Sequence, residues 1–330
     1  MKADVVIVGA GPSGLTASTH LAKTRNVVLI EQSLRYSKSC AGGITSKTLH
    51  FIPRHLIEKK FKTALIHTPY QTIKIESEKP FLYTISREAL AEWQLKQALS
   101  VGVELIKAKA LSLKNNVLIT TDQKIKYNYL IGADGSTSII RRSLNLKTEN
   151  YAITVQYTLN NEYPNIEFFI DATRFGSGYA WIFPHDSYTI IGAGSFIKAK
   201  QLKTNLDKLI KRLNLKINSK PKFWPINFDF QGYNFNPIFL IGDAAGFASP
   251  LTGEGLYQAF ISGIEIARKI TNPTHGCNLI KDLLKTRKRH QQITKFLTIS
   301  RYLTRIQHEL ITLLLRIKPI QKLAIKKLSY

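Results

Sequence analysis

Three glycines near the N-terminus have the spacing of a phosphate-binding turn. Gly9, Gly11 and Gly14 form a Gly-x-Gly-x-x-Gly segment between an apolar run and a helical pattern. Gly9 permits a tight strand-to-helix turn, Gly11 lets backbone amides approach a pyrophosphate, and Gly14 allows close helix–strand packing. Ser13 lies at the start of that helix, whose free N–H groups and dipole favour an anion. The segment predicts a dinucleotide site.

An acidic residue follows at the distance that such a site needs. Glu31 lies 17 residues beyond Gly14, at the end of the next apolar run. Its carboxylate can accept hydrogen bonds from the diol of an adenosine ribose. An ordinary structural turn is the alternative interpretation of the glycines. The strand before, the helix after and the acid together favour a nucleotide site.

Two later segments favour FAD over NAD. Residues 130–138 read LIGADGSTS around Asp134, and residues 239–246 read FLIGDAAG around Asp243. A strand ending in Gly-Asp places a carboxylate at the carboxyl edge of the sheet, where open α/β folds bind ligands. Asp243 can there bind ribityl hydroxyls, although it could instead only cap the following helix. The loop after Asp243 leads into a further helix near the flavin. The residues predicted to contact the cofactor there are Pro250, Gly253, Gly255 and Leu256.

The surrounding elements predict an α/β fold. Strand, helix and strand patterns at 4–8, 13–23 and 27–30 form a first βαβ unit. A helix is expected at 86–100, with Ser86 as its N-cap and an apolar stripe formed by Leu90, Trp93, Leu95, Ala98 and Leu99. Further strands are expected at 104–106, 117–120 and 129–132, and short antiparallel strands within 62–86.

The second half of the chain changes character. Residues 151–231 are rich in strand patterns and aromatic residues, with one helix at 205–213. A buried strand and a helix return at 238–242 and 255–270, and the remainder is helical, amphipathic and basic. We therefore predict a Rossmann-like FAD-binding lobe, an antiparallel β-sheet substrate lobe and a helical C-terminal tail. Their predicted ranges are 1–150 with 232–275, 151–231, and 276–330.

Composition limits the other classes of function. Cys40 and Cys277 are the two cysteines, and the eight histidines lack metal-ligand spacing, so we expect no metal. No run approaches the roughly 20 apolar residues of a spanning helix, and the short N-terminal apolar run does not resemble a signal segment. We expect a cytoplasmic protein.

The charge is unusual. Lys and Arg number 47 against 22 acids, a net +25, and residues 276–330 alone carry 13 basic and two acidic residues. Such a surplus attracts nucleic acid or an anionic bilayer. Nucleic acid is disfavoured because no recognition motif accompanies the charge. The tail has two interpretations. Residues 276–330 could contact the inner face of an anionic membrane peripherally, or their helices could pack on the domain.

Residues 4–260 resemble the para-hydroxybenzoate-hydroxylase-like FAD superfamily, and within it the geranylgeranyl reductase family. The resemblance rests on CAGG at 40–43, the Asp134 segment, YAWIFP at 179–184 and the loop at 250–255. The chain departs from the family pattern where Gly176 replaces a proline, where Ala91 replaces an acid, and in its short basic tail. These departures leave the length and identity of the substrate open.

The resemblance also implies roles for individual residues. Glu31 would bind the adenosine ribose and Asp243 the ribityl chain. Arg87 would meet the FAD phosphates and Ala110 the adenine. The flank of the flavin would be lined by Cys40, Ala41 and Gly43. A prenyl pocket would be lined by Tyr179, Trp181 and Phe183, which alternation places on one face of a strand; these rings could equally be core.

The implied reaction is hydride transfer from reduced FAD to a C=C bond of a prenyl-like, hydrophobic substrate. Cys40, Tyr179 or an ordered water could supply the proton, and Cys40 could instead be a core thiol. NAD(P)H or another donor would reduce the flavin. A flavin monooxygenase or halogenase is the alternative, because halogenases of this superfamily carry a similar segment in which Tyr179 would be Trp and Phe183 would be Ile. A non-enzymatic basic protein that binds membrane or nucleic acid is the third hypothesis.

Overall fold

The computed structural model describes residues 1–33, 38, 40–297 and 301–329, and the chain forms two compact units. The first comprises Met1–Ser37, Leu90–Tyr151 and Ile226–His290, and the second comprises Lys38–Ala89, Ala152–Pro225 and Gln291–Tyr330. The division of the chain into a cofactor domain, a substrate domain and a tail stays a prediction. The contacts themselves group residues 38–89 with 152–225 and divide the tail after His290.

The first unit is built on an eight-stranded sheet whose main order is β17-β18-β11-β1-β2-β8. The five strands from β18 to β8 pair in parallel; β10 pairs antiparallel with β11, and β9 pairs antiparallel with β10. The strands are β1 (Lys2–Val8), β2 (Val27–Glu31), β8 (Glu104–Lys107), β9 (Ala110–Lys114), β10 (Val117–Thr120), β11 (Lys124–Gly132), β17 (Asn234–Phe235) and β18 (Ile238–Leu240).

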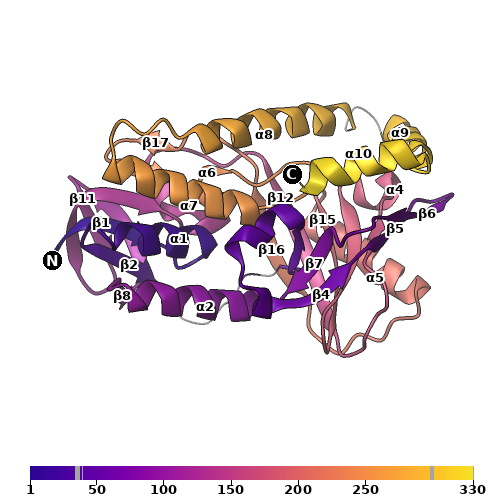
Figure 1. Cartoon of the computed structure of the whole chain (residues 1–330), viewed down its shortest axis with the longest axis horizontal. Helices are drawn as coiled ribbons and strands as arrows, with labels where there is room; N and C mark the ends of the chain where they lie inside the picture. Colours follow the sequence, from indigo (N-terminus) through magenta and orange to yellow (C-terminus); the bar gives the residue numbers. More distant parts are fainter. Residues whose placement is uncertain (34–37, 39, 298–300, 330) are drawn as a thin grey trace. The chain divides into compact units, whose positions relative to one another are not determined.

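Helices pack on this sheet and complete one apolar core (Figure 1). They are α1 (Pro12–Leu21), α2 (Arg87–Ser100, which begins in the second unit), α3 (Ile139–Ser143), α6 (Gly242–Ala245), α7 (Leu256–Thr271) and α8 (Asn278–Phe296). Helix α1 packs closely on α7, because a Cβ on Gly263 would lie 2.7 Å from the carbonyl oxygen of Ser13. The absence of a side chain at Gly263 therefore sets the distance between the two helices.

The second unit contains a seven-stranded sheet, ordered β16-β12-β15-β14-β13-β5-β6, and a three-stranded sheet, ordered β3-β7-β4. All pairings that join β12, β15, β14 and β13 are antiparallel, whereas β13 and β5 are parallel. The strands are β3 (Gly43–Thr45), β4 (Ile57–Phe61), β5 (Thr63–His67), β6 (Thr72–Glu76), β7 (Leu82–Ile85), β12 (Tyr151–Leu159), β13 (Glu167–Phe169), β14 (Tyr179–Pro184), β15 (Thr189–Ser195) and β16 (Lys222–Asn227).

Helices α4 (Ala172–Phe175) and α5 (Ala199–Arg212) cover one face of the large sheet, and α9 (Arg301–Leu314) and α10 (Lys318–Ser329) belong to the same unit. Leu202, Leu206 and Leu209 of α5 share a buried cluster with Ala180 and Ile182 of β14. The opposite face of β14 therefore remains for other contacts. Within the described residues, no helix is long and apolar enough to cross a membrane.

The structure confirms the predicted fold class, with local differences. Ser86 caps α2, since its hydroxyl accepts a hydrogen bond from the N–H of Ala89 (3.1 Å). The predicted apolar stripe of α2 was wrong at Leu99, which is exposed, because the buried polar Gln94 contacts α1. The helix expected at 205–213 begins earlier, at Ala199, where no side chain forms a cap. Strands β9 and β16 and helix α4 were not predicted.

Candidate functional site

The glycine turn of the first unit is held by contacts between main-chain atoms. Gly9 has φ +105°, and a Cβ there would lie 2.4 Å from the carbonyl oxygen of Ala133. A Cβ on Gly14 would lie 2.0 Å from the carbonyl oxygen of Gly9. At Gly11 the nearest atom would be 4.0 Å away. Gly9 and Gly14 are thus required by the protein itself, whereas the missing side chain of Gly11 leaves open space into which a diphosphate can fit.

The helix that follows is suited to an anion. Within the described chain, α1 has no side-chain cap and no acid in its first turn, and Pro12 occupies one of its first positions. Its first N–H groups and the positive end of its dipole are therefore available to a phosphate. Ser13 is buried in that first turn.

Glu31 is fixed at the end of β2 by two backbone donors. Its Oε2 accepts a hydrogen bond from the N–H of Ala10 (2.7 Å), and its Oε1 accepts one from the N–H of Ser33 (2.9 Å). Each carboxylate oxygen can accept a second hydrogen bond, so two ribose hydroxyls can still be bound. Ala110 opens β9 beside a register shift at Thr120, and it is buried.

Asp243 lies in the short helix α6, directly after β18. Its Oδ2 accepts a hydrogen bond from the hydroxyl of Ser136 (3.3 Å), while Asn227 donates from its side chain to the Asp243 carbonyl (3.0 Å). A Cβ on Gly255 would lie 3.2 Å from Oδ1, so the carboxylate sits against the N-cap of α7. Ser136 and Asn227 were not identified from the sequence, because no spacing rule relates them to Asp243.

The loop before α7 is closed by its own hydrogen bonds. The N–H of Ser249 donates to the carbonyl of Glu254 (2.8 Å), and the N–H of Gly253 donates to the carbonyl of Ser249 (2.9 Å). Gly253 has φ +68°, which favours glycine. Pro250 lies inside this closed loop, and Gly255 and Leu256 begin α7. The loop is thus a compact platform at the start of that helix.

Asp134 has a local role that the sequence did not specify. Its carboxylate accepts hydrogen bonds from the Ser138 hydroxyl (2.5 Å) and from the N–H groups of Ile139 (2.6 Å) and Ile140 (3.3 Å). Burial raises the pKa of this carboxyl above its ordinary value, an effect that these hydrogen bonds oppose. Asp134 therefore organises the start of α3, and its contact with a cofactor stays a prediction.

A buried arginine, Arg141, and a half-buried one, Arg287, fasten the segment that carries Asp243. Arg141, 1% exposed, donates to the carbonyls of Ala244 (3.3 Å) and Asp229 (2.6 Å), and its guanidinium lies 3.6 Å from the Asp229 carboxylate. Burial would raise the pKa of Asp229, but hydrogen bonds from the Glu149 N–H and Gln231, with the charge of Arg141, lower it overall. From α8, Arg287 donates to the Gly246 carbonyl (3.2 Å). None of these residues was predicted.

The segment at 40–43 belongs to the second unit. Gly43 lies against the ring of Phe183, because a Cβ there would be 2.1 Å from Cε2. Buried His185 donates from Nε2 to the Ala41 carbonyl (3.0 Å), and its Nδ1 lies 2.5 Å from Oε2 of Glu58. Cys40 is half-buried. These contacts join the predicted cysteine loop to the predicted aromatic strand.

Two further side chains of the second unit have notable surroundings. Arg87 is buried at the start of α2, and its contact with the FAD phosphates stays a prediction. Tyr188 stacks on His185 with ring centroids 4.3 Å apart. Burial, followed by the nearby charge of Glu58, raises the pKa of Tyr188 to about 12, so its phenol stays protonated at neutral pH.

The aromatic residues of β14 form a continuous row on one face of the sheet. The ring centroids of Tyr179 and Trp181 are 5.8 Å apart, and those of Trp181 and Phe183 are 6.4 Å apart. Phe168 of β13 was not predicted, and it packs edge-on against Tyr179 (6.0 Å) and Phe183 (5.5 Å). These four residues are called the aromatic face below. Residue alternation on β13 was the signal that could have found the fourth ring.

Two glycines of β15 accommodate the indole of Trp181. A Cβ on Gly192 would lie 2.5 Å from Cζ2, and one on Gly194 would lie 3.4 Å from Cζ3. These glycines therefore let β15 pack closely against the indole of Trp181. The indole Nε1 is buried and has no hydrogen-bond partner among the residues that the structure describes. A buried donor of this kind points to an acceptor supplied by a ligand or water.

A cluster at the end of α7 offers three metal-ligand types. Single ligand atoms of Glu265, His275 and Cys277 lie within 4.8 Å of one another, a grouping that spacing did not indicate. The Glu265 carboxylate already contacts His275 (3.0 Å), Arg268 (3.3 Å) and the N–H of Leu279 (3.0 Å). We interpret it as a buried carboxylate satisfied by hydrogen bonds.

Taken together, the parallel sheet, glycine turn, fixed acid and second carboxylate define a dinucleotide-binding flavoprotein lobe. Sequence comparison agrees. The model of the FAD binding domain family matches residues 106–295, and that of the Thi4 family matches residues 1–108.

Similar proteins narrow the family. A digeranylgeranylglycerophospholipid reductase of Methanosphaera stadtmanae is 30% identical over 81% of this chain and 77% of its own length. A geranylgeranyl diphosphate reductase of Rhodobacter capsulatus is 28% identical over 80% of this chain and 73% of its own. The chain belongs to the geranylgeranyl reductase family of FAD-dependent oxidoreductases.

Solved structures show the same fold. A geranylgeranyl bacteriochlorophyll reductase-like protein of Thermoplasma acidophilum superimposes with a TM-score of 0.78 at 22% identity, covering 91% of this chain and 88% of that one. A flavin-dependent brominase gives a TM-score of 0.74 at 14% identity, covering 100% of this chain and 94% of that one. The family model and the sequence relatives confirm the FAD cofactor and the oxidoreductase class, whereas the individual site residues stay predictions.

Proposed function

We propose that this enzyme reduces C=C bonds of the prenyl chain of a lipid. The observation that carries the proposal is the aromatic face, in which four rings in mutual contact, with two glycines of β15 against Trp181, make a continuous apolar surface. Relatives of this chain are named as reductases of geranylgeranyl diphosphate and of digeranylgeranylglycerophospholipids. An isoprenoid chain would gain about 0.8 kcal/mol for each methylene-sized group that it buries on such a surface.

The residues of the first unit fit FAD. The open space at Gly11 and the uncapped start of α1 would hold the diphosphate, while Glu31 would hold the adenosine ribose and Asp243 the ribityl chain. The chemistry supplied by this cofactor when bound and reduced is transfer of a hydride to a C=C bond. The chain or a bound water would supply the one proton that, with this hydride, saturates the bond.

The chain itself would position the alkene, exclude water and manage the proton. The aromatic face would exclude water from the prenyl chain, and the Trp181 N–H would donate to an oxygen of the substrate or to a water. Cys40 and Tyr179 remain the candidate proton donors, with an ordered water as the third. His185 would hold the Cys40 loop through the Ala41 carbonyl. NAD(P)H or another donor would reduce the flavin.

A spectroscopic experiment tests the proposal. Purified protein should show the two visible absorption bands of oxidised flavin. After anaerobic reduction, geranylgeranyl compounds should restore these bands and gain two hydrogen atoms per turnover by mass spectrometry. A fully saturated analogue of each compound is the control and should leave the flavin reduced.

Other products would favour the alternative chemistry. If prenyl compounds leave the flavin reduced, and air with NADPH yields a product that has gained oxygen or halogen, the enzyme is a monooxygenase or halogenase. The similarity in fold to a brominase is the specific reason to include halide in that assay.

A lipid substrate also places the reaction at a membrane. We infer peripheral contact of the basic segment 276–330 with the inner face of an anionic membrane, because this segment carries 13 of the 47 basic residues and two of the 22 acids.

A further inference from the structure

Helix α9 has its polar side turned toward the protein. Thr304, His308 and Thr312 are 3%, 8% and 2% exposed, and their spacing of four residues places them on one helix face. Large apolar side chains occupy the outward face: Leu303, Ile306, Leu310, Ile311, Leu313 and Leu314. A helix of a globular domain normally turns its apolar face to the core. The opposite arrangement requires a partner outside the unit.

Polar contacts hold this helix in place. The Glu309 carboxylate accepts hydrogen bonds from the Thr68 hydroxyl (2.7 Å) and from the side chain of Gln71 (2.8 Å). Both donors lie in or beside the hairpin of β5 and β6. The helix is thus fixed by specific bonds on its polar side, and its outward face is a consequence of that docking.

Helix α10 extends the same surface. Gln321 is buried and donates to the Lys74 carbonyl (3.1 Å), while its oxygen accepts a hydrogen bond from the N–H of Glu76 (3.1 Å). Ile325 joins the buried cluster beside β6. Ile317, Ile320 and Leu323 are exposed. Figure 1 shows α9 and α10 as the yellow helices next to β5 and β6. We call the exposed apolar side chains of 303–323 the outward apolar face.

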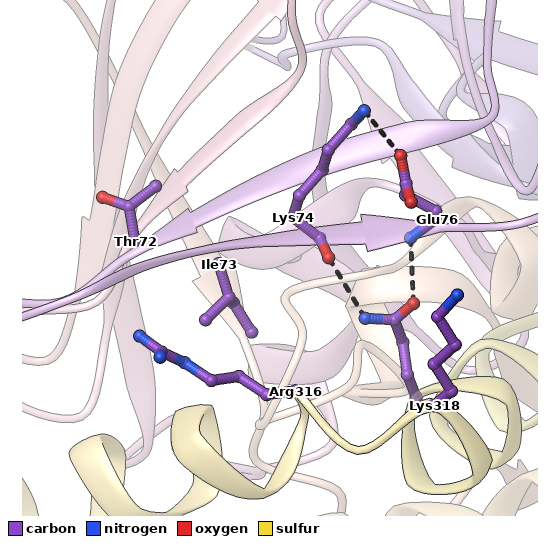
Figure 2. A pocket seen from close by; sticks show the side chains of 7 residues that line it. Thr72, Ile73, Lys74, Glu76, Arg316 and Lys318 are labelled. Atoms are coloured by element: carbon purple, nitrogen blue, oxygen red, sulfur yellow. Dashed lines mark hydrogen bonds and ion pairs between the residues drawn. The ribbon is translucent and has the colours of Figure 1, made fainter.

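The sequence of these two helices is rich in basic residues. Residues 301–329 contain seven Lys and Arg and one acid, Glu309, which is engaged as described. A hollow of about 280 Å³ lies between β6 and the turn from α9 to α10, where it is lined by Arg316 and Lys318 (Figure 2). Lys74 pairs with Glu76 across 2.5 Å. Figure 2 shows this pair extending from the other side of the strand, so Arg316 and Lys318 are the cations on the helix side.

We propose that the outward apolar face is a docking surface for an anionic phospholipid bilayer. The apolar side chains enter the boundary between headgroups and acyl chains, and Arg316 and Lys318 contact lipid phosphates. A second copy fits less well, because a symmetric pair would bring Lys322 and Lys326 of both chains together, and lysine is depleted in protein interfaces. The inference rests on the membrane contact proposed above for 276–330 and assigns it to α9 and α10, but it does not depend on the proposed reaction.

Vesicle co-sedimentation of the full FAD-loaded chain tests the proposal. The protein should sediment with vesicles of phosphatidylcholine and phosphatidylglycerol in equal amounts, and remain in the supernatant with phosphatidylcholine alone. The double variant Leu310→Ser/Leu314→Ser should weaken binding at least about tenfold, since it removes two apolar groups from the interface. The matched control is Leu111→Ser, which removes an exposed leucine of β9 and should bind as the unaltered protein does.

A charge variant tests the phosphate contacts. Arg316→Gln/Lys318→Gln should weaken binding roughly thirtyfold at low salt, from about fivefold for each cation near an anionic surface. Lys208→Gln/Lys211→Gln on α5 makes the same change in net charge away from the face and should have a much smaller effect. Unchanged flavin absorbance and urea unfolding curves verify that every variant is folded.

Three results would overturn the proposal. The first is a chain that stays in the supernatant with anionic vesicles. The second is that light scattering finds a dimer of the unaltered protein and a monomer of the Leu310→Ser/Leu314→Ser variant. The third is calorimetric binding of inorganic phosphate at Arg316 and Lys318 without vesicle binding. Reductase activity on detergent-dispersed prenyl lipid distinguishes this failure from a failure of the proposed reaction.

Discussion

The glycine turn of the first unit and the aromatic face of the second are built from different parts of the chain. In the turn, added side-chain atoms at Gly9 or Gly14 would meet main-chain atoms at 2.4 Å and 2.0 Å. In the aromatic face, rings meet rings at centroid distances of 5.5 to 6.4 Å. Main-chain contacts allow almost no adjustment, whereas ring contacts can change with small rotations. The turn should therefore tolerate substitution far less than the face.

The largest effect is expected for Gly14→Ala. The new Cβ would meet the Gly9 carbonyl, so the free energy of unfolding should fall by about 3 kcal/mol and bound FAD should be lost. Gly11→Ala is the matched control, because its Cβ has open space and the apoprotein should lose no more than about 0.5 kcal/mol. Urea unfolding and flavin absorbance measure both effects. Equal destabilisation by the two variants would remove the distinction between the glycines.

Asp243→Asn tests whether the second carboxylate binds the cofactor. Loss of a charged hydrogen-bond acceptor should weaken FAD binding by roughly 2 kcal/mol, or about thirtyfold, with little change in the stability of the apoprotein. Fluorescence titration of apoprotein with FAD measures the affinity. Asp122→Asn, at an exposed turn, is the control. An unchanged affinity in Asp243→Asn would limit Asp243 to its bond with Ser136.

Asp229→Asn tests how much the ion pair of Asp229 with Arg141 stabilises the segment that carries Asp243. The four rings of the aromatic face have no ion pair among them. The pKa of Asp229 is lowered in the folded state, so its contribution is present above the ordinary value of 3.8 and is lost as the pH falls through the folded pKa. The variant should lose about 1.5 kcal/mol at neutral pH. Urea unfolding of both proteins at a series of pH values should show this difference shrinking below 3.8. A constant difference would contradict the charged role.

The smallest effect is expected for Trp181→Phe. The change removes the buried indole N–H while keeping a ring on the aromatic face, so KM for a prenyl substrate should rise about fivefold, or roughly 1 kcal/mol. Flavin absorbance and FAD affinity should stay unchanged. Trp93→Phe on α2 is the control, and steady-state kinetics is the measurement. A loss of FAD without a change in KM would place Trp181 in the cofactor site instead.

Local patterns predicted the glycine turn, the acid of β2 and the cap of α2 for a physical reason. The glycine turn, Glu31 and the Ser86 cap depend on residues close in sequence, and each has a stereochemical requirement that few residue types meet. The exposed Leu99 shows the limit of this reasoning. Hydrophobic periodicity cannot reveal that α2 packs against the hydroxyl of Thr16. Gln94 is buried there because its side chain donates a hydrogen bond to that hydroxyl.

The unpredicted site residues are joined across long distances in the sequence. Arg141 reaches Asp229, Ser136 reaches Asp243, and His185 reaches Glu58. Side chains such as these can serve many roles, so residue type alone does not identify their partners. Only the folded chain brings the members of each pair within hydrogen-bond distance.

The sequence by itself determined an FAD-binding α/β protein with an aromatic strand and a basic tail, because backbone geometry and charge are properties of short segments. Tertiary structure decided which surfaces these segments present. It placed residues 38–89 with the aromatic sheet, set Gly43 against Phe183, and turned the polar side of α9 inward. An amphipathic helix has two faces, and tertiary hydrogen bonds such as those of Glu309 on α9 and Gln321 on α10 determine which face meets the surroundings.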